Sequence, residues 1–281
     1  MRCRDNSLFI RLQKPRRKAG FFFADKTDCS HERTITEMKT RERFLELDLL
    51  RTAAVAMMII FHTAFDLSAF YNVSIDPFSG GWLVLQRVTA NLFLLLVGIS
   101  FAVSYGRMEA KGASRQDMYR KYVKRGVLVL LCGMLVTLVT RIAIPDDYVR
   151  FGVLHLIGMG ILILPFVMPL REGNLILAML VFLMGYATGI APDGLGIILL
   201  PLGWMPAGFR SADYFPLFPW LGTILLGVAM GNALYNRGWL RWHLRDNRLT
   251  RIITEPGRYA LMIYLAHQPV LLSALWILLR N

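Results

Sequence analysis

Cysteine is scarce in this sequence. The chain has 281 residues and three cysteines, Cys3, Cys29 and Cys132. Their positions give neither a disulfide framework nor the closely spaced ligand pairs of a metal site, so we expect no metal. The chain also lacks an internal repeat, a phosphate-binding loop and a dinucleotide-binding fingerprint. Any chemistry must therefore come from other polar side chains.

Long hydrophobic runs, in contrast, are abundant. Hydrophobic residues make up 55% of the chain, and its mean hydropathy is +0.46. The runs are continuous, whereas barrel strands would show short alternating segments. Because a helix needs about 20 apolar residues to cross a bilayer, the sequence predicts an all-α polytopic integral membrane protein. We expect seven transmembrane helices, near residues 45–67, 82–105, 126–144, 152–169, 174–191, 215–235 and 258–279.

The distribution of basic residues predicts how these helices are oriented. Lysine and arginine outnumber aspartate and glutamate by 32 to 19, for a formal net charge of +13. The basic residues gather at 106–125 and 236–258, while the alternate connections carry only Arg150 and Arg210. The positive-inside rule then places the N-terminus in the cytoplasm and predicts a multi-pass protein of the cell (cytoplasmic) membrane. Topology and contact with membrane lipids account for the charge, so no nucleic-acid partner is expected.

Residues 1–40 differ from the rest of the chain. They are polar and mixed in charge, and they lack the apolar core of a secretory signal. We expect a disordered, dispensable cytoplasmic extension. An alternative is that translation starts at Met38, because "MKTRERFLELD" gives a basic flank directly before the first apolar run. Residues 41–281 then form the transmembrane domain.

The first apolar run, "ELDLLRTAAVAMMIIFHTAFDL" (46–67), contains four ionisable residues: Asp48, Arg51, His62 and Asp66. Each costs on the order of 3 kcal/mol in hydrocarbon, so such residues normally face a protein interior or a wet cavity. At about 100° per residue they fall within about 60° of one another. The pattern indicates a lipid-facing helix with one functional edge.

His62, Asp66 and Arg51 are the strongest candidates on this edge. His62 and Asp66 are spaced i, i+4, so the carboxylate could orient the imidazole as a general base or nucleophile. The alternative is a helix end that reaches interfacial water. Arg51 lies about 16 Å deeper on the same face, which approximates the reach of a pantetheine arm. Its guanidinium could bind a phosphate, or it could simply pair with Asp48.

Two further segments at the outer face carry polar candidates. In "RFGVLHLIG", Arg150 and His155 could stabilise an oxyanion or deprotonate an acceptor, or could serve as an interfacial anchor and a packing residue. The segment "WMPAGFRSADYFPLFPW" (204–220) could form the rim of an acceptor cleft or an interfacial aromatic belt. Its candidate substrate-binding residues are Arg210, Asp213 and Trp220.

The last apolar run is interrupted by "HQP", His267 to Pro269. Proline removes a backbone hydrogen bond and frees a carbonyl near Tyr264 and Leu265, so the kink can point polar groups into a cavity. His267 and Gln268 are candidates for contact with a cofactor or acyl group. A hydrogen bond that packs two helices together is the alternative.

Four blocks, in order, resemble the catalytic domain of heparan-alpha-glucosaminide N-acetyltransferase: "ELDLLRTAAVAMMIIFHTAFDL", "RFGVLHLIGMGILI", "DYFPLFPWLGTILLGVAMG" and "GRYALMIYLAHQPVLL". The Arg-x10-His spacing of Arg51 and His62 also resembles the first-helix signature of wider transmembrane acyltransferases. The resemblance covers roughly residues 41–280. It implies transfer of an acyl group, usually acetyl from cytoplasmic acetyl-CoA, to a hydroxyl or amine of an extracytoplasmic glycan or lipid acceptor. It further implies that His62 is the catalytic histidine and that Arg51 lies near the CoA.

Two other classes remain open at this stage. A transporter or proton pathway would also use an intramembrane stripe of ionisable residues, although no inverted repeat is visible. A haem-binding membrane protein could use two of His62, His155 and His267 as ligands. The sequence leaves the oligomeric state open, a homo-oligomer included.

Overall fold

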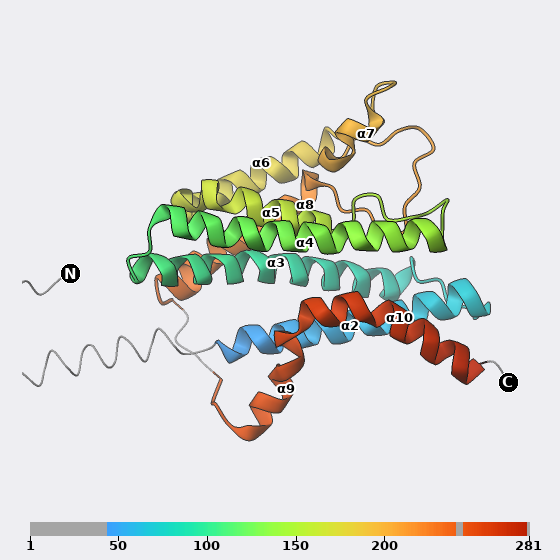
Figure 1. Ribbon diagram of the computed structural model, residues 1–281, viewed down its shortest axis with the longest axis horizontal. Helices are drawn as coiled ribbons and strands as arrows, with labels where there is room; N and C mark the ends of the chain where they lie inside the picture. The colour runs from blue at the N-terminus through green and yellow to red at the C-terminus, as the bar shows by residue number, and fades with distance from the viewer. Residues whose placement is uncertain (1–43, 240–243, 280–281) are drawn as a thin grey trace, which may run out of the picture. The chain divides into compact units, whose positions relative to one another are not determined.

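The computed structural model describes residues 44–239 and 244–279. The expected extension at 1–40 and the alternative start at Met38 lie outside the described residues. Within them, all regular elements are helical, apart from two isolated β-bridges, which confirms the all-α class (Figure 1). The α-helices are α2 (Leu45–Tyr71), α3 (Gly80–Ala110), α4 (Arg115–Ala143), α5 (Val153–Val167), α6 (Asn174–Tyr186), α7 (Gly196–Leu199), α8 (Leu217–Gly231), α9 (Arg248–Arg258) and α10 (Ala260–Leu279).

Six helical stretches of the described chain are long and apolar enough to cross a membrane. They are Leu45–Tyr71, Gly80–Ala110, Arg115–Ala143, Val153–Tyr186, Leu217–Asn236 and Ala260–Leu279. This confirms a polytopic membrane protein. The fourth stretch is not one straight helix, because Arg171 has non-helical backbone angles (φ 49°, ψ −117°) between α5 and α6. Two of the seven expected helices, 152–169 and 174–191, coincide largely with this stretch, so the number of spans stays a prediction, as does the cytoplasmic N-terminus.

The connections on either side of the fourth stretch contact each other. The backbone N–H of Ala212 donates to the carbonyl of Asp147 over 2.6 Å, and Phe151 forms an isolated bridge with Tyr214. The segment before α5 and the segment after α6 therefore meet at one end of the bundle. The chain runs along α5, turns at Arg171 and returns along α6 in the opposite direction (Figure 1).

Two features differ from the sequence expectation. α4 begins at Arg115 rather than near 126, so several basic residues of the 106–125 stretch lie on a helix. Ser114 caps it by accepting a hydrogen bond from the backbone N–H of Asp117. The second feature is α9, a short helix that was not expected within the basic stretch 236–258. It starts at a reciprocal cap between Asn247 and Thr250.

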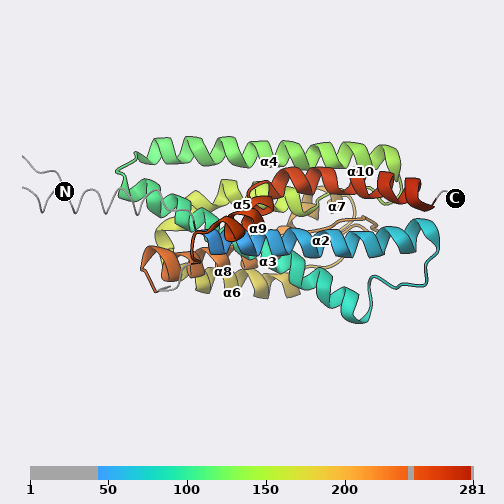
Figure 2. The same cartoon turned by 90° about the horizontal axis from the view of Figure 1, so that it is seen from below.

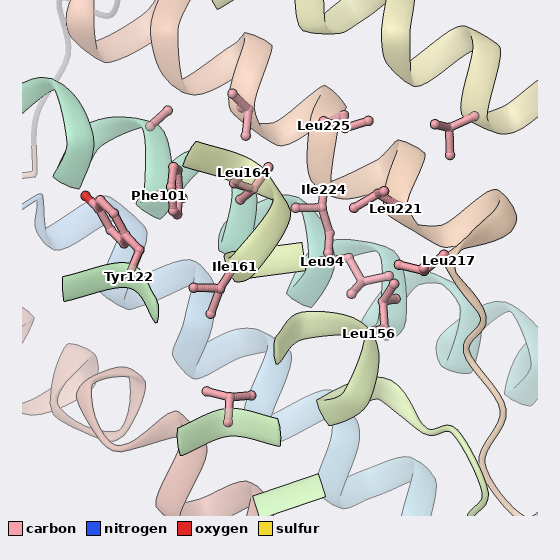
Figure 3. Close-up of a cluster of buried hydrophobic side chains, with 14 of the residues drawn as sticks. Leu94, Phe101, Tyr122, Leu156, Ile161, Leu164, Leu217, Leu221, Ile224 and Leu225 are labelled. Atoms are coloured by element: carbon pink, nitrogen blue, oxygen red, sulfur yellow. The ribbon is translucent and has the colours of Figure 1, made fainter. Parts of the chain in front are cut away.

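The main core lies where α3, α4, α5 and α8 meet. Figure 3 shows Leu94 of α3, Tyr122 of α4, Leu156 of α5 and Ile224 of α8, all fully buried. α3 and α8 approach each other at Gly98 and Gly227, where each backbone lies against a carbonyl of the other helix. Small residues allow such contacts between apolar helices, where dispersion rather than water exclusion stabilises the pair.

α2 is held by α3, α9 and α10 (Figure 2). The backbone N–H of Gly257 in α9 donates to the Thr52 hydroxyl over 2.9 Å. α10 begins directly after α9, so this contact fixes where α10 starts relative to α2. The helix that carries Arg51, His62 and Asp66 thereby packs against the helix that carries His267 and Gln268.

Candidate active site

Two histidines meet where α10 packs on α2. The ring centroids of His62 and His267 are 4.8 Å apart, and the rings are tilted by 57°. His267 is buried, with 8% of its surface exposed, whereas His62 is half-buried. Helical spacing predicted that His62 lies on a functional edge of the first helix. In the structure the second imidazole comes from His267, 205 positions later in the chain. This His62–His267 contact is the centre of the candidate site.

Gln268 connects His62 to Asp66. Its side-chain nitrogen Nε2 lies 3.1 Å from His62 Nδ1 and 3.4 Å from Asp66 Oδ1. Asp66 is completely buried. The carboxylate that the i, i+4 spacing assigned to His62 therefore reaches the imidazole through an amide from α10. Gln268 is placed to orient His62.

His267 is held by its own helix. Its Nδ1 lies 2.6 Å from the carbonyl oxygen of Tyr264. Pro269 follows two residues later and lacks a backbone N–H, so it removes the helical hydrogen bond to the carbonyl of Leu265. The carbonyl that holds His267 is the preceding one, that of Tyr264.

Three buried polar atoms of this cluster have no hydrogen-bond partner among the described residues. They are Asp66 Oδ2, Gln268 Oε1 and His267 Nε2. Buried polar atoms in folded proteins are nearly always paired, and those that are not commonly meet water or a ligand. Because the three atoms cluster on two adjacent helices, a molecule bound there would supply their missing hydrogen bonds.

A cavity of about 230 Å³ lies between α2, α3, α4, α5 and α10. Its wall is mostly apolar and includes Phe93, Val97, Ile157 and Leu261. Arg51 and Ser100 also line it, as does Tyr264, whose carbonyl holds His267. The cavity wall at Tyr264 is therefore about one turn of α10 from His267, and neither His62 nor His267 lines the cavity itself.

The cavity adjoins a basic surface groove on α4. Arg125 and Leu128 line both the cavity and this groove. The other groove residues are Asp117, Arg120, Lys121 and Lys124. Basic side chains on the surface of α4 thus lie next to the apolar cavity.

Arg51 lines the cavity and is held by two neighbours. It forms an ion pair with Asp48, and its other terminal nitrogen donates to the Ser100 hydroxyl over 2.5 Å. The ion pair with Asp48 is one of the two sequence interpretations of Arg51, and phosphate binding by its guanidinium, which also lines the cavity, stays a prediction. Ser100 gave no signal in the sequence, since a serine in an apolar helix is common.

His155 lies apart from the pair, at the contact of α5 with α4. Its Nδ1 accepts a hydrogen bond from the backbone N–H of Gly152 over 3.2 Å, and its Nε2 lies 3.5 Å from the Thr137 hydroxyl. Gly133 of α4 leaves room for the ring. These contacts cap α5 and join it to α4, so we leave His155 out of the proposed chemistry.

Asp213 also caps α5, from a distant loop. Its Oδ2 accepts the backbone N–H of Val153 over 3.0 Å. Burial raises the pKa of Asp213 to about 6, although the hydrogen bond from Val153 opposes the shift. An acceptor at a helix N-terminus satisfies N–H groups that the helix leaves unpaired. The structure thus gives this predicted substrate-binding residue a contact within the protein.

The remaining candidates lie in the same outer region. Arg210 forms an exposed ion pair with Asp147. The Arg150 guanidinium lies over the rings of Tyr148 and Phe209, at 4.8 Å and 5.2 Å.

Trp220, near the start of α8, packs 4.7 Å from Phe215 and lies 5.8 Å under the Arg87 guanidinium. Cations stacked on aromatic rings are surfaces that suit sugars and polar headgroups.

The described residues contain no group of three or more His, Cys, Asp or Glu side chains that could hold a metal ion. The His62 and His267 rings are in direct contact, and His155 is bonded elsewhere. A haem held by two of these histidines would need their rings on opposite faces of the iron. The arrangement of the three rings in the structure is different.

The fold and the histidine cluster define a multi-pass helical membrane protein with a polar site inside its bundle. Residues 43–269 match the family heparan-alpha-glucosaminide N-acetyltransferase, catalytic, and the chain belongs to this family of membrane acetyltransferases. The comparison with curated proteins and the comparison with solved structures found no match. The resemblance seen in the four sequence blocks is confirmed at the level of the family.

Proposed function

We propose that this protein takes acetyl-CoA from the cytoplasm and transfers the acetyl group to a hydroxyl or amine of an extracytoplasmic glycan or lipid. The family supports acetyl transfer as the class of reaction. The donor, the acceptor and the direction across the membrane are parts of the proposal.

The cavity and the neighbouring basic groove support an acyl-CoA donor. Pockets for whole drug-sized ligands measure roughly 300–1,000 Å³, so a cavity of about 230 Å³ suits a thioester arm better than a nucleotide. The nucleotide phosphates would remain on the basic groove, where Arg120, Lys124 and Arg125 offer positive charge. Arg51 would contact the donor inside the cavity.

The single observation that carries the proposal is the position of Tyr264. It lines the apolar cavity, and its carbonyl binds His267, which contacts His62. A thioester bound beside Tyr264 would lie about one turn of α10 from the two imidazoles, which do not themselves line the cavity. Imidazole can take up and release a proton near neutral pH, as acyl transfer requires.

The acceptor would approach from the outer side. Arg150 with its two aromatic neighbours, and Trp220 with Arg87, offer surfaces for a sugar or headgroup. Arg210 and Asp213 are held by Asp147 and Val153, so we propose that they shape this region.

The test uses full-length protein in lipid nanodiscs with radiolabelled acetyl-CoA. Free thiol and labelled product are measured with glucosamine, other amino sugars and an extract of membrane glycolipids as acceptors. We expect acceptor-dependent release of CoA, and we expect the His62→Ala variant to lose it while its CoA affinity stays within a few-fold. Folded protein that binds no CoA and releases none with any of these acceptors would contradict the proposal.

A matched flux measurement addresses the transporter alternative. The same protein is placed in liposomes, and proton or acetyl-CoA movement is followed without an acceptor. Sustained flux with no acetylated product would favour a transport protein over the enzyme.

A further inference from the structure

The hydrogen bonds at the site determine which nitrogen of each imidazole carries the proton. A neutral imidazole has one N–H donor and one acceptor nitrogen, and its partners decide which is which. The partner of His267 Nδ1 is the carbonyl oxygen of Tyr264, which can only accept. His267 Nδ1 therefore carries the hydrogen, and Nε2 has a free lone pair. That Nε2 is one of the three buried atoms of the cluster that have no hydrogen-bond partner among the described residues.

His62 has the opposite arrangement. An ionised Asp66 carboxylate can only accept, so the atom of Gln268 that faces it must be the side-chain nitrogen. The same nitrogen has a second hydrogen and lies 3.1 Å from His62 Nδ1. His62 Nδ1 therefore accepts, and its proton resides on Nε2.

Rotating the Gln268 amide would bring Oε1 next to the Asp66 oxygen, so two acceptors would face each other in a buried place. An unpaired buried polar group costs free energy, and a buried carboxylate costs more. Asp66 is completely buried, so this penalty applies in full. The hydrogen bonds that link Asp66, Gln268 and His62 thus have one favoured direction: the Gln268 nitrogen donates both to Asp66 Oδ1 and to His62 Nδ1.

We propose that the two histidines have different catalytic roles, with His267 Nε2 as the general base and His62 Nε2–H as the donor that stabilises the oxyanion. This division of roles rests on the acetyl transfer proposed above. It reverses the simplest expectation from the sequence, in which His62 is the base or nucleophile. Asp66 and Gln268 are positioning residues, because they act through His62.

The reaction balances with these two groups. The acceptor oxygen or nitrogen attacks the thioester carbon while His267 Nε2 takes its proton. The carbonyl oxygen becomes an oxyanion and accepts a hydrogen bond from His62 Nε2–H. When the intermediate collapses, the carbon–sulfur bond breaks and the leaving thiolate takes the proton from His267. The products are the acetylated acceptor and CoA thiol, and both histidines return to their starting states.

Amide substitutions separate the two roles. In His267→Asn the side-chain N–H can still donate to Tyr264, but the base is gone. We expect the turnover rate to fall by about 10²–10⁴-fold, the usual contribution of a general base. In His62→Gln an N–H can still reach the position of Nε2–H, so we expect a loss below about 10-fold. His62→Ala removes the donor and should lose about 10²–10³-fold, as for an oxyanion-hole donor.

The opposite pattern would overturn the assignment. If His62 were the base or nucleophile, His62→Gln would be as inactive as His62→Ala, and His267→Asn would retain most of its activity. CoA affinity and melting temperature are measured on each variant, so that rates refer to folded protein that binds the donor.

A second measurement does not require activity. Nitrogen-15 NMR of histidine-labelled protein in nanodiscs distinguishes the two imidazole tautomers, and the His62 and His267 variants assign their signals among the five histidines of the chain. We expect the proton on Nδ1 of His267 and on Nε2 of His62. We also expect Asp66→Asn, which can donate to a rotated Gln268 oxygen, to shift His62 toward the Nδ1–H form. The same tautomer on both rings in the wild-type protein would overturn the inference. If instead acetyl transfer fails while the tautomers are as expected, the proposed function is wrong and the hydrogen-bond assignment holds.

Discussion

Arg51 shows how one charged side chain can serve both the fold and a ligand. It pairs with Asp48, bonds to Ser100 and still lines the cavity. Removing it alone would leave the buried Asp48 carboxylate without its ion pair, and the resulting loss of stability would be hard to separate from a loss of binding. A test of Arg51 as a CoA contact therefore has to neutralise both partners.

We expect the double variant Asp48→Asn with Arg51→Gln to fold and to bind CoA about 10–150-fold more weakly. The basis is that one charge-assisted contact to a phosphate contributes about 1.5–3 kcal/mol. The measurement is CoA affinity by titration calorimetry in nanodiscs, and the single variant Asp48→Asn is the control. Equal affinity in the control and the double variant would remove Arg51 from the donor site.

Helix periodicity was enough to place Arg51, His62 and Asp66 on one edge, because it depends only on spacing along a single helix. It could not supply Gln268 and His267, which come from α10 about 200 residues later. The sequence marked those two residues through Pro269, but not what they contact. Ser100 gave no signal in the sequence, since its role arises only where five helices surround a cavity, and Tyr264 was marked only for its position near the proline.

Among the helices, α3 and α8 depend on glycine at their contact. A Cβ at Gly98 would overlap the carbonyl oxygen and backbone of α8 at Ile224 and Gly227. Two residues further along α3, Ser100 bonds to Arg51. The glycine contact therefore also fixes one wall of the cavity.

We expect Gly98→Ala to lower the free energy of unfolding by about 1–3 kcal/mol or more, as overpacking does when backbone must move. Gly81→Ala is the matched control on the same helix, because nothing lies within 4 Å of the added carbon. It should be neutral or stabilise by up to about 1 kcal/mol, since alanine favours the helix. Thermal unfolding in detergent compares the two. Equal melting temperatures for both variants would show that α3 and α8 are not in close backbone contact at Gly98.

The cap of α5 by Asp213 gives a pH dependence whose sign can be worked out. Burial raises the pKa of Asp213 from 3.8 to about 6, so the native state binds this proton more tightly than the unfolded chain does. The free energy of unfolding that this group contributes therefore falls as pH rises from about 4 to about 6, by at most about 3 kcal/mol.

We expect Asp213→Asn to lose this part of the pH dependence while it keeps an acceptor for the Val153 N–H. The control is Asp193→Asn, because Asp193 is exposed in the connection between α6 and α7. Melting temperatures are recorded from pH 4 to pH 7. If wild-type and Asp213→Asn proteins show parallel curves, the carboxyl is not buried in the folded state.

The predicted order of helices agrees with the structure because long apolar runs report lipid exposure directly. The ends of the helices were less predictable: α4 continues through basic residues that were expected to precede it, and α9 forms inside a charged stretch. In both, a local cap starts the helix where hydropathy gives no signal. The loop contacts of Asp147 with Arg210 and Ala212 depend on tertiary structure alone.

The path of the entire chain across the membrane depends on how Val153–Tyr186 is counted. If this stretch crosses once, the basic residues at 106–125 and 236–258 lie on opposite sides. If it crosses twice, both lie on the same side, as the positive-inside rule requires. The contacts between the segments before α5 and after α6 favour two crossings, because they bring both segments to one end of the bundle. We therefore expect seven crossings with the N-terminus in the cytoplasm.

Single-cysteine labelling tests this path. In a variant with Cys3, Cys29 and Cys132 replaced by serine, cysteine is introduced at one exposed position in each of five connections: Ser74, Lys111, Asp146, Asp193 or Arg237. With a membrane-impermeant maleimide on intact cells, we expect labelling at 74, 146 and 193, and labelling at 111 and 237 only after the membrane is opened. Asp193 is decisive, because a single crossing by Val153–Tyr186 would place it with Lys111 rather than with Asp146. Protection of position 193 together with labelling at 146 would therefore refute the returning path. Labelling of 111 and 237 from outside, with protection of 74, 146 and 193, would reverse the orientation and place the basic groove on the side away from cytoplasmic CoA.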